Sequence, residues 1–467
     1  MIQNDLHNYL GIDVVVEDPP TDEDILQKYM PCMWIEDKKN RYINEHVFAD
    51  TFIELNHLQY NNGLFYSKEG RKTDDTVAST IASSIREMGI YQDVERTTKK
   101  LLGAVKLTAH TESLDVDPNL IPFANGDFDI NKWQFHMGSH NPSPYRLKAD
   151  LPLEFRDTPN FLKWLKDLFY EEDIMTIQEY LGYCLVPSTK AQKALFLVGE
   201  GGAGKSVLGV ILEAILGEAM LSTSSTQEFL QDKFKLAELE HKLVLYDDDL
   251  DSEALSGTGM YKKLITNTLA VTADRKYGQP FKFTPSIKLV SCCNEMLSSK
   301  YDNTEGFYRR LLPIVIKPIS KDFKPDLQFY DKIRAEAEGI LQWSLFGLRR
   351  LILNGWVLTE SDRTKAYVAQ KRGIGNHFPD FMESVFEFDP SYEIPTTEIL
   401  SAYQVWCRKN ACDALKSRTV QGWLSDNAEK YGLERSRTVR SGDTYVRGYK
   451  GLRVRENYSN KGLITLK

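Results

Sequence analysis

The chain has 467 residues, of which 42% are hydrophobic and 11% aromatic, and it carries a net charge of −8. This length suggests about three domains of roughly 150 residues, and the apolar content excludes an intrinsically disordered chain. The six cysteines are scattered, the first residues lack the pattern of a secretory signal, and no apolar run could span a membrane. We therefore expect a cytoplasmic protein with reduced thiols, no zinc site and no membrane partner.

Residues 1–110 are mixed in pattern and carry no motif with an evident chemistry, so we treat them as an N-terminal domain of unassigned role. Residues 74–91 have the periodicity of a helix, and "VEDPPTDED" at residues 16–24 predicts a turn. In residues 111–190, a domain that we expect to be mainly helical, "IPFANGDFDINKWQFH" predicts short strands around an Asn-Gly turn. Residues 158–186 predict two amphipathic helices, the first with Phe161, Leu165, Leu168 and Phe169 on one stripe.

From residue 191 to about 325, strand-like and helix-like segments alternate. The run "ALFLV" is followed by "GEGGAGKS", which fits the phosphate-binding pattern G-x-x-x-x-G-K-[ST], and then by an apolar helix. Backbone N–H groups of such a loop bind phosphate oxygens, and the helix adds its positive N-terminal end. The pattern predicts that Lys205 reaches the β- and γ-phosphates of ATP and that Ser206 is a ligand of Mg²⁺. The predicted nucleotide-binding residues are Gly199, Glu200, Gly201, Gly202, Ala203, Gly204, Lys205, Ser206 and Val207.

Acidic residues follow the next apolar run, "KLVLYDDDLD". A carboxylate at the end of a strand beside a phosphate loop can hold the magnesium ion, and a neighbouring carboxylate can orient the attacking water. We assign Asp247 to the metal and Asp248 to the water. Taken alone, an acidic cluster after a strand is also ordinary turn chemistry.

Two further polar positions flank strand-like runs. "SIKLVSCCNEM" ends in Asn294, whose amide we expect to hold the lytic water, although an Asn also begins turns. Arg309 and Arg310 precede the run "LLPIVIKP". An arginine that reaches a neighbouring subunit's γ-phosphate stabilises transition-state charge, and we favour Arg310 over Arg309 for this role; a surface salt bridge is the alternative for each.

Between these motifs, "VTADRKYGQPFKFTP" predicts a hairpin with a basic and aromatic tip at Arg275, Lys276 and Tyr277. A cation that neutralises phosphate and a ring that stacks on any base suit sequence-independent binding of single-stranded DNA. An exposed turn with incidental charge is the alternative.

Residues 326–380 look helical and end in "KRGIGNHFPD", which we interpret as a linker. A small basic domain follows at residues 381–467. From residue 391 it carries 14 Lys or Arg against 8 Asp or Glu, a balance of +6, so the rest of the chain carries −14. Two predicted helices and a hairpin turning at residues 441–443 suggest a winged-helix domain. It could bind origin duplex DNA, bind a partner protein or cap the preceding ATP-binding domain, and a solvated basic face is the plainest alternative. For DNA binding we single out Arg418, Gln421, Arg437, Arg440 and Arg447.

In their order, the phosphate loop, the strand ending in Asp-Asp, "DRKYGQPFKF", the strand ending in Asn and the Arg-Arg pair resemble a superfamily 3 DNA helicase, a hexameric AAA+-type motor. "FANGDFDI" and "IQEYLGYCLVPSTKAQKALFLVGEGGAGKS" are similar to the phage and plasmid primase–helicase family within that group. The resemblance covers residues 115–350 and implies that Lys276 and Tyr277 grip DNA in a central channel while Asp274 and Arg275 position them. It also implies movement from 3′ to 5′. We see no room for the polymerase-type primase domain that many relatives carry.

These patterns predict an α/β fold: a P-loop motor with a central parallel sheet, helical regions before it and a winged-helix domain after it. The function that we expect is an ATP- and Mg²⁺-dependent replicative DNA helicase of a phage, plasmid or genomic island. It would form a homo-hexamer, load itself at an origin and act on single-stranded and forked DNA, with a primase or other replication proteins as further partners. The alternatives are a P-loop ATPase that remodels or packages DNA without unwinding it, and a DNA-binding regulator switched by ATP.

Overall fold

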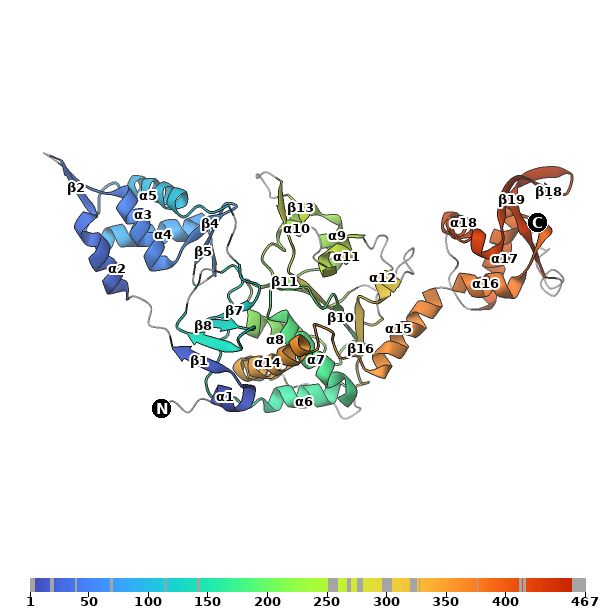
Figure 1. Cartoon of the computed structure of the whole chain (residues 1–467), viewed down its shortest axis with the longest axis horizontal. Coiled ribbons are helices and arrows are strands. Elements are labelled where there is room, and N and C mark those ends of the chain that lie inside the picture. The colour runs from blue at the N-terminus through green and yellow to red at the C-terminus, as the bar shows by residue number, and fades with distance from the viewer. Residues whose placement is uncertain are drawn as a thin grey trace. The chain divides into compact units, whose positions relative to one another are not determined.

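The computed structural model describes residues 5–16, 21–37, 40–67, 70–112, 114, 116–139, 141, 143–250, 259–266, 270–274, 280–295, 305–319, 326, 328–375, 377–410, 414 and 417–455 (Figure 1). These residues fall into two compact units. The first comprises the described residues up to 365 except α12 (Glu305–Tyr308), and the second comprises α12 and the residues from 366 onward.

The N-terminal part of the first unit has its own hydrophobic core, formed by residues between Met33 and Ala109. Helices α3 and α5 pack against each other, as do α4 and α5, and β4, β5 and β6 form a three-stranded antiparallel sheet beside them. The helix predicted at residues 74–91 is confirmed, although α4 already ends at Glu87. The elements are α2 (Asp22–Tyr29), η1 (Met30–Cys32), β2 (Trp34–Asp37), β3 (Asn40–Ile43), α3 (Glu45–Asn56), β4 (Gln59–Asn61), β5 (Leu64–Ser67), β6 (Gly70–Lys72), α4 (Asp74–Glu87) and α5 (Val94–Thr108).

A four-stranded sheet in the order β1-β9-β8-β7 is formed by segments that come before the motor region in the chain. Its strand β1 comes from the start of the chain and runs parallel to β9. Leu6, Leu10 and Ile12 therefore belong to the main core rather than to the core of residues 33–109, and the segment that we predicted as one domain, 1–110, divides between two cores. The predicted hairpin is confirmed, but its turn residues are Ala124 and Asn125, because Phe123 pairs with Gly126 and this glycine is the first residue of β8. The elements are α1 (Asp5–Leu10), β1 (Asp13–Val16), β7 (Leu120–Phe123), β8 (Gly126–Asp129), β9 (Gln134–Met137), α6 (Pro159–Leu168) and α7 (Glu171–Cys184).

The predicted central parallel sheet is confirmed. Five strands lie in the order β11-β12-β15-β10-β16, and each neighbouring pair is parallel. Their nearly uninterrupted burial is what a parallel sheet covered on both faces requires. The strands are β10 (Ala194–Val198), β11 (Leu221–Thr223), β12 (Val244–Asp247), β15 (Lys288–Cys293) and β16 (Leu311–Val315). The surrounding helices are α8 (Val207–Leu216), α9 (Thr226–Gln231), α10 (Lys233–Ala237), α11 (Gly259–Thr266), α13 (Phe329–Ala335) and α14 (Ala337–Leu353).

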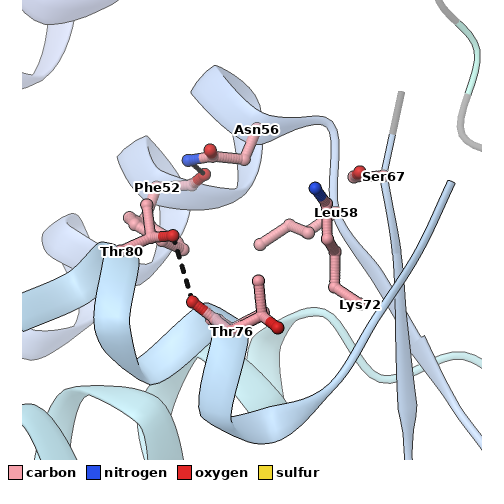
Figure 2. A pocket seen from close by; sticks show the side chains of 8 residues that line it. Phe52, Asn56, Leu58, Ser67, Lys72, Thr76 and Thr80 are labelled. Atoms are coloured by element: carbon pink, nitrogen blue, oxygen red, sulfur yellow. Dashed lines mark hydrogen bonds between the residues drawn. The ribbon is translucent and has the colours of Figure 1, made fainter. Parts of the chain in front are cut away.

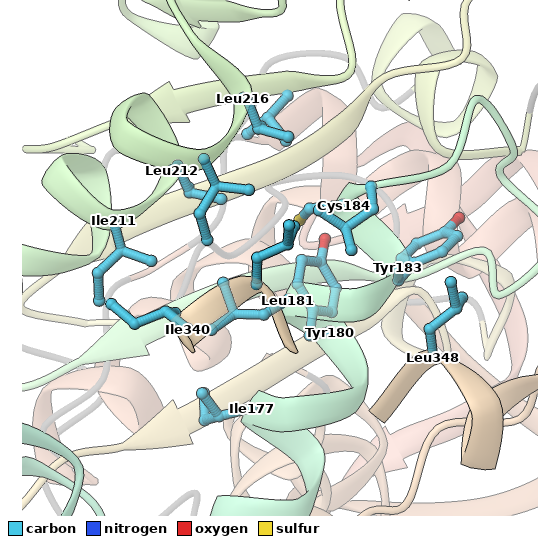
Figure 3. Close-up of a cluster of buried hydrophobic side chains, with 14 of the residues drawn as sticks. Ile177, Tyr180, Leu181, Tyr183, Cys184, Ile211, Leu212, Leu216, Ile340 and Leu348 are labelled. Carbon is cyan, nitrogen blue, oxygen red and sulfur yellow. The ribbon is translucent and has the colours of Figure 1, made fainter. Parts of the chain in front are cut away.

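Helices α7, α8 and α14 share the main core with this sheet. Figure 3 shows Tyr180 and Leu181 of α7, Ile211 of α8 and Ile340 of α14 within it. The backbones of α7 and α14 touch at Gly347. A Cβ atom added to this glycine would lie 2.1 Å from the carbonyl oxygen of Gln178, so only glycine allows the contact. The Tyr180 hydroxyl also donates to the Leu289 carbonyl oxygen at 2.9 Å, which ties α7 to the sheet.

The second unit folds around a core contributed by helices α16, α17 and α18 and a three-stranded antiparallel sheet in the order β17-β19-β18. The two predicted helices and the hairpin are confirmed, with Ser441 pairing with Thr444 across the turn. Strand β17 and helix α16 were not predicted. The elements are α15 (Asp362–Gly375), which begins in the first unit, α16 (His377–Val385), β17 (Phe386–Pro395), α17 (Thr396–Lys409), α18 (Ser417–Asp426), η2 (Glu429–Tyr431), β18 (Glu434–Ser441) and β19 (Thr444–Val454).

The interpretation of "KRGIGNHFPD" as a linker was wrong for the described part of that stretch. Helix α15 continues to Gly375 and α16 begins at His377, so the backbone is helical on both sides of residue 376. Phe378 and Phe381 of α16 are buried in the core of the second unit. Buried aromatic residues stabilise a helix through packing, so these two side chains stabilise α16 as a part of the second unit.

Candidate active site

The glycine loop lies between the end of β10 and the start of α8. Gly199 follows β10, and a Cβ atom there would lie 2.3 Å from Cγ1 of Ile316, so only glycine fits. Gly204 has a φ of +91°, a conformation that other residues rarely adopt. Strand β10 has β15 on one side and β16 on the other. The loop therefore opens at the carboxyl edge of the sheet, where parallel α/β sheets bind their ligands.

The Lys205 side chain extends along this edge from the loop to the neighbouring strand. Its ammonium group donates to the carbonyl oxygens of Gly199, of Glu200 at 3.4 Å and of Cys293 at 3.1 Å. Cys293 is the last residue of β15, and its carbonyl oxygen also accepts from the Gly199 N–H at 3.1 Å. The lysine charge is thus held beside the loop by three backbone dipoles.

Ser206 and the acidic strand end meet at the same edge. The Ser206 hydroxyl donates to Oδ2 of Asp248 at 3.1 Å, and the Tyr246 hydroxyl donates to Oδ1 of the same carboxylate at 2.6 Å. Asp247 faces elsewhere: its Oδ2 accepts from the Thr226 N–H at 2.7 Å, and the side chain is buried. Because side chains alternate along a strand, the residue beside Ser206 is Asp248, one position later than the metal ligand that we predicted.

Tyr246 is a site residue that the sequence patterns did not single out. Its ring packs so closely on α8 that a Cβ atom on Gly209 would lie 2.5 Å from Cε1 of the ring. Burial is the main cause that raises the pKa of Tyr246, so its hydroxyl stays protonated and acts as a donor. Burial likewise raises the pKa of the neighbouring Cys292 and Cys293 thiols to about 12, which leaves them neutral. Close contact between a glycine of one helix and a tyrosine of a distant strand has no local sequence signal.

Asn294 is the first residue after β15 and is exposed at the carboxyl edge. The register of the sheet pairs Cys293 with Val198, so the residues that follow these two strands, Asn294 and Gly199, emerge side by side. Lys205, Ser206, Asp248 and Asn294 are thus brought to one edge by three neighbouring strands and the loop.

Arg310 lies at the opposite edge of the sheet. Its carbonyl oxygen accepts from the N–H of Ala194, the first residue of β10, at 2.8 Å. At about 3.3 Å per residue, the length of β10 separates this edge from the glycine loop by roughly 15 Å. Arg309 is exposed, and Arg310 is partly buried. Within one chain, neither arginine therefore lies with Lys205, Ser206, Asp248 and Asn294 at the carboxyl edge of the sheet.

The predicted DNA-binding tip, Arg275, Lys276 and Tyr277, lies outside the described residues. The strands on either side of it are described: β13 (Val271–Ala273) pairs antiparallel with β14 (Phe281–Phe283), with Ala273 opposite Phe281. In the second unit, Arg418 is exposed on α18 and Gln421 is partly buried there. Arg437 and Arg440 are exposed on β18, and Arg447 is exposed on β19.

A cavity of about 190 Å³ lies in the N-terminal region, away from this group of residues (Figure 2). Phe52, Leu58 and Val77 give it an apolar wall, and Thr76 and Thr80 of α4 line it as well. The Thr80 hydroxyl donates to the Thr76 carbonyl oxygen at 3.1 Å, so this polar group is satisfied within its own helix. Among the described residues, no helix is long and apolar enough to cross a membrane.

Two protein families match parts of the chain. Residues 32–170 match a family described as D5 N terminal like, and residues 197–310 match a family of unknown function, DUF5906. Neither match covers half of the chain. The first extends into the N-terminal region to which the sequence patterns gave no role. The second contains the glycine loop, the acidic strand end, Asn294 and the two arginines.

Curated viral proteins are similar over a longer stretch. "Putative helicase L207/L206" of Acanthamoeba polyphaga mimivirus is 25% identical over 323 residues, which are 62% of this chain and 32% of that protein. "Putative helicase 121R" of Invertebrate iridescent virus 3 is 22% identical over 275 residues, which are 52% of this chain and 29% of that protein. The chain thus spans about a third of the length of these relatives.

Solved structures of the C-terminal region of NrS-1 are also similar. An apo structure gives a TM-score of 0.47 at 14% identity and covers 89% of this chain and 100% of that one. A second apo structure, the A form, gives a TM-score of 0.43 at 14% identity and covers 81% and 84%. On the evidence of the two curated relatives, the chain is similar to viral proteins that are named as putative helicases.

Proposed function

We propose that the protein is an ATP-driven DNA helicase of the superfamily 3 type. The observation that carries this proposal is the convergence of Lys205, the Ser206–Asp248 pair and Asn294 at the carboxyl edge of one parallel sheet. A glycine loop that opens at this edge, followed directly by a helix, is suited to phosphate binding. The similarity to viral proteins that are named as helicases supports unwinding of a nucleic-acid duplex as the work that ATP hydrolysis drives.

In this proposal, Lys205 exchanges its carbonyl contacts for the β- and γ-phosphate oxygens of ATP and neutralises charge that develops as the γ-phosphate leaves. The hydroxyl of Ser206 and the carboxylate of Asp248 are hard oxygen donors 3.1 Å apart, a pair that fits Mg²⁺. Ser206 and Asp248 would hold the ion, which would supply positive charge that stabilises the phosphate oxygens. Tyr246 orients the carboxylate, and Asn294 holds the attacking water at the neighbouring strand end.

We expect Asp248→Asn to raise the Mg²⁺ concentration needed for half-maximal ATP turnover by about 10–100-fold. Asp247→Asn is the matched control, because the amide oxygen can still accept from the Thr226 N–H. It should leave the Mg²⁺ dependence unchanged and lower the free energy of unfolding by about 1–3 kcal/mol, since a charged hydrogen bond becomes a neutral one. Magnesium titrations of turnover and urea unfolding measure the two effects. If Asp247→Asn instead needed much more Mg²⁺ for turnover and Asp248→Asn behaved like the wild type, Asp247 would be the metal ligand.

In this proposal, the hairpin formed by β13 and β14 holds the DNA strand. Lys276 would bind phosphate, Tyr277 would stack on bases and Arg275 would position the tip. A ring of six subunits, translocation from 3′ to 5′ and self-loading at the origin of a phage, plasmid or genomic island complete the proposal. The chain's similarity to viral proteins supports a mobile-element setting.

The second unit is the proposed origin-binding domain. The order α16-β17-α17-α18-β18-β19 places two helices before a hairpin, as a winged helix does. Val439 of β18 is fully buried, so its neighbour Arg440 points away from the core, directly opposite the 72% exposed Tyr445 of β19. Arg418 and Gln421 of α18 would face base edges, while the hairpin arginines would contact phosphates.

Replacing Arg437, Arg440 and Arg447 together by glutamine should weaken binding to all duplex sequences alike. The slope of log K against log salt concentration should flatten by about one unit for each phosphate that the variant no longer neutralises. Arg453→Gln is the matched control, because Arg453 is already paired with Glu387, with its Nη2 3.0 Å from the carboxylate. Filter binding or fluorescence anisotropy across a salt series measures the slopes. An unchanged slope in the triple variant would favour a partner-binding or capping role for this unit.

Two other functions use the same ATP site. An ATPase that remodels or packages DNA would hydrolyse ATP on DNA but leave a forked duplex intact. A regulator switched by ATP would show turnover that single-stranded DNA does not raise. Turnover and strand separation, measured together on a forked substrate, distinguish the three.

A further inference from the structure

Helix α6 lies outside the region predicted as the motor, yet it contacts the glycine loop directly. The indole Nε1–H of Trp164, near the middle of α6, donates to the carbonyl oxygen of Gly204 at 3.0 Å. Trp164 is 5% exposed, and its ring packs against Phe161 and Phe169. The indole is therefore held in place by its neighbours and not by the loop.

Helix α6 is itself fixed at both ends by segments that follow the sheet in the chain. At its start, the carboxylate of Glu336 accepts from the N–H groups of Asn160 at 3.0 Å and Phe161 at 2.9 Å. At its end, the Lys317 N–H donates to the Leu168 carbonyl oxygen at 2.8 Å. Two anchors of this kind leave α6 little freedom, so Trp164 presents its donor to the loop from a rigid position.

The contact determines the direction of one peptide unit of the loop. In a planar trans peptide, the C=O and the following N–H point in opposite directions. With its oxygen held by Trp164, the unit between Gly204 and Lys205 directs the Lys205 N–H away from α6. Gly204 has a φ of +91° and no side chain to restrict it, so the backbone there would otherwise sample several orientations. The indole removes this freedom before any nucleotide binds.

We propose that Trp164 is a positioning residue for phosphate binding: by holding the Gly204 carbonyl, it keeps the loop in its nucleotide-binding conformation and senses its occupancy. This inference rests on the proposed ATP site and adds a residue to it that lies outside both the motif and the motor segment. The hydrogen bond should change the equilibrium constant for nucleotide binding by about fivefold, the usual contribution of one such bond.

The test is equilibrium binding of ADP and of a non-hydrolysable ATP analogue to the full-length Trp164→Phe protein. We expect the Kd to rise by about 2–10-fold, and the change in tryptophan fluorescence on nucleotide binding to be abolished. Trp343→Phe is the matched control, because Trp343 packs on the same Phe161 ring, at 4.9 Å between centroids, from α14. It should keep both the affinity and the fluorescence change.

A second variant separates the hydrogen bond from packing. Incorporating a benzothienyl analogue at position 164 keeps the size of the indole and replaces the N–H by sulfur, so it should reproduce the loss of affinity without a loss in urea stability. Wild-type affinity in both position-164 variants would overturn the inference. Failure of the wild-type protein to bind any nucleotide would instead refute the proposed ATP site, so the two ideas fail separately.

Discussion

Lys205→Ala should reduce ATP turnover by at least about 10²–10³-fold, the effect expected when a charge that stabilises the transition state is removed from a preorganised site. Lys205 contacts the loop carbonyls of Gly199 and Glu200 and the end of β15 at Cys293. Its ammonium group is therefore already placed where the phosphates would lie between the loop and the strand end. A steady-state phosphate-release assay at saturating ATP and Mg²⁺ measures the loss.

The control for Lys205→Ala is Lys163→Ala, which removes the same charge from the exposed side of α6. It should hydrolyse ATP at the wild-type rate. Urea unfolding of both variants checks that the comparison is between folded proteins. If Lys205→Ala kept more than about a tenth of the wild-type turnover, the glycine loop would not be the phosphate site.

Arg310→Ala should bind nucleotide nearly as tightly as the wild type but hydrolyse it about 10³–10⁵-fold more slowly, the range known for arginine fingers. The expectation follows from the sheet. Arg310 lies beside Ala194 at the amino edge, one strand length away from the glycine loop of its own chain. An arginine at that edge can act on phosphate only if another subunit supplies the loop. Arg309→Ala, one residue earlier and exposed, is the matched control and should retain turnover.

Mixing the two defective proteins tests the same geometry. A ring that contains both Arg310→Ala and Lys205→Ala subunits has some interfaces with an intact loop on one side and an intact arginine on the other. Such mixtures should regain part of the wild-type turnover, with a maximum at intermediate ratios. Mixtures as inactive as their components would rule out action between subunits. A severe loss of turnover in Arg309→Ala would assign the role of the arginine finger to Arg309.

The sequence patterns could single out residues that the fold brings to one edge of the sheet, because the signals for these residues are local. A glycine loop between a buried strand and an apolar helix, a strand that ends in acidic residues and a strand that ends in Asn are each readable within a short segment. Since parallel strands share a carboxyl edge, these separate signals also imply that the residues meet, as Lys205 does with Cys293. The parallel sheet and the C-terminal hairpin were predictable for the same reason.

What could not be predicted depends on contacts between distant segments. Which of Asp247 and Asp248 faces Ser206 is decided by where β12 ends and by the packing of Tyr246 on Gly209. The bond from Trp164 to Gly204 joins residues 40 positions apart in different helical and loop segments. The start of the chain joins the main core through the pairing of β1 with the distant β9. Periodicity and motif spacing contain none of this information.

The measurement that tests the central claim most directly is ATP hydrolysis and strand separation by the wild-type protein on a forked DNA duplex, with Lys205→Ala as the reference. We predict Mg²⁺-dependent ATP turnover that rises with single-stranded DNA, together with strand separation that requires ATP and is absent in the variant. Turnover without strand separation on any fork would contradict the helicase assignment, and no ATP turnover at all would contradict the motor itself.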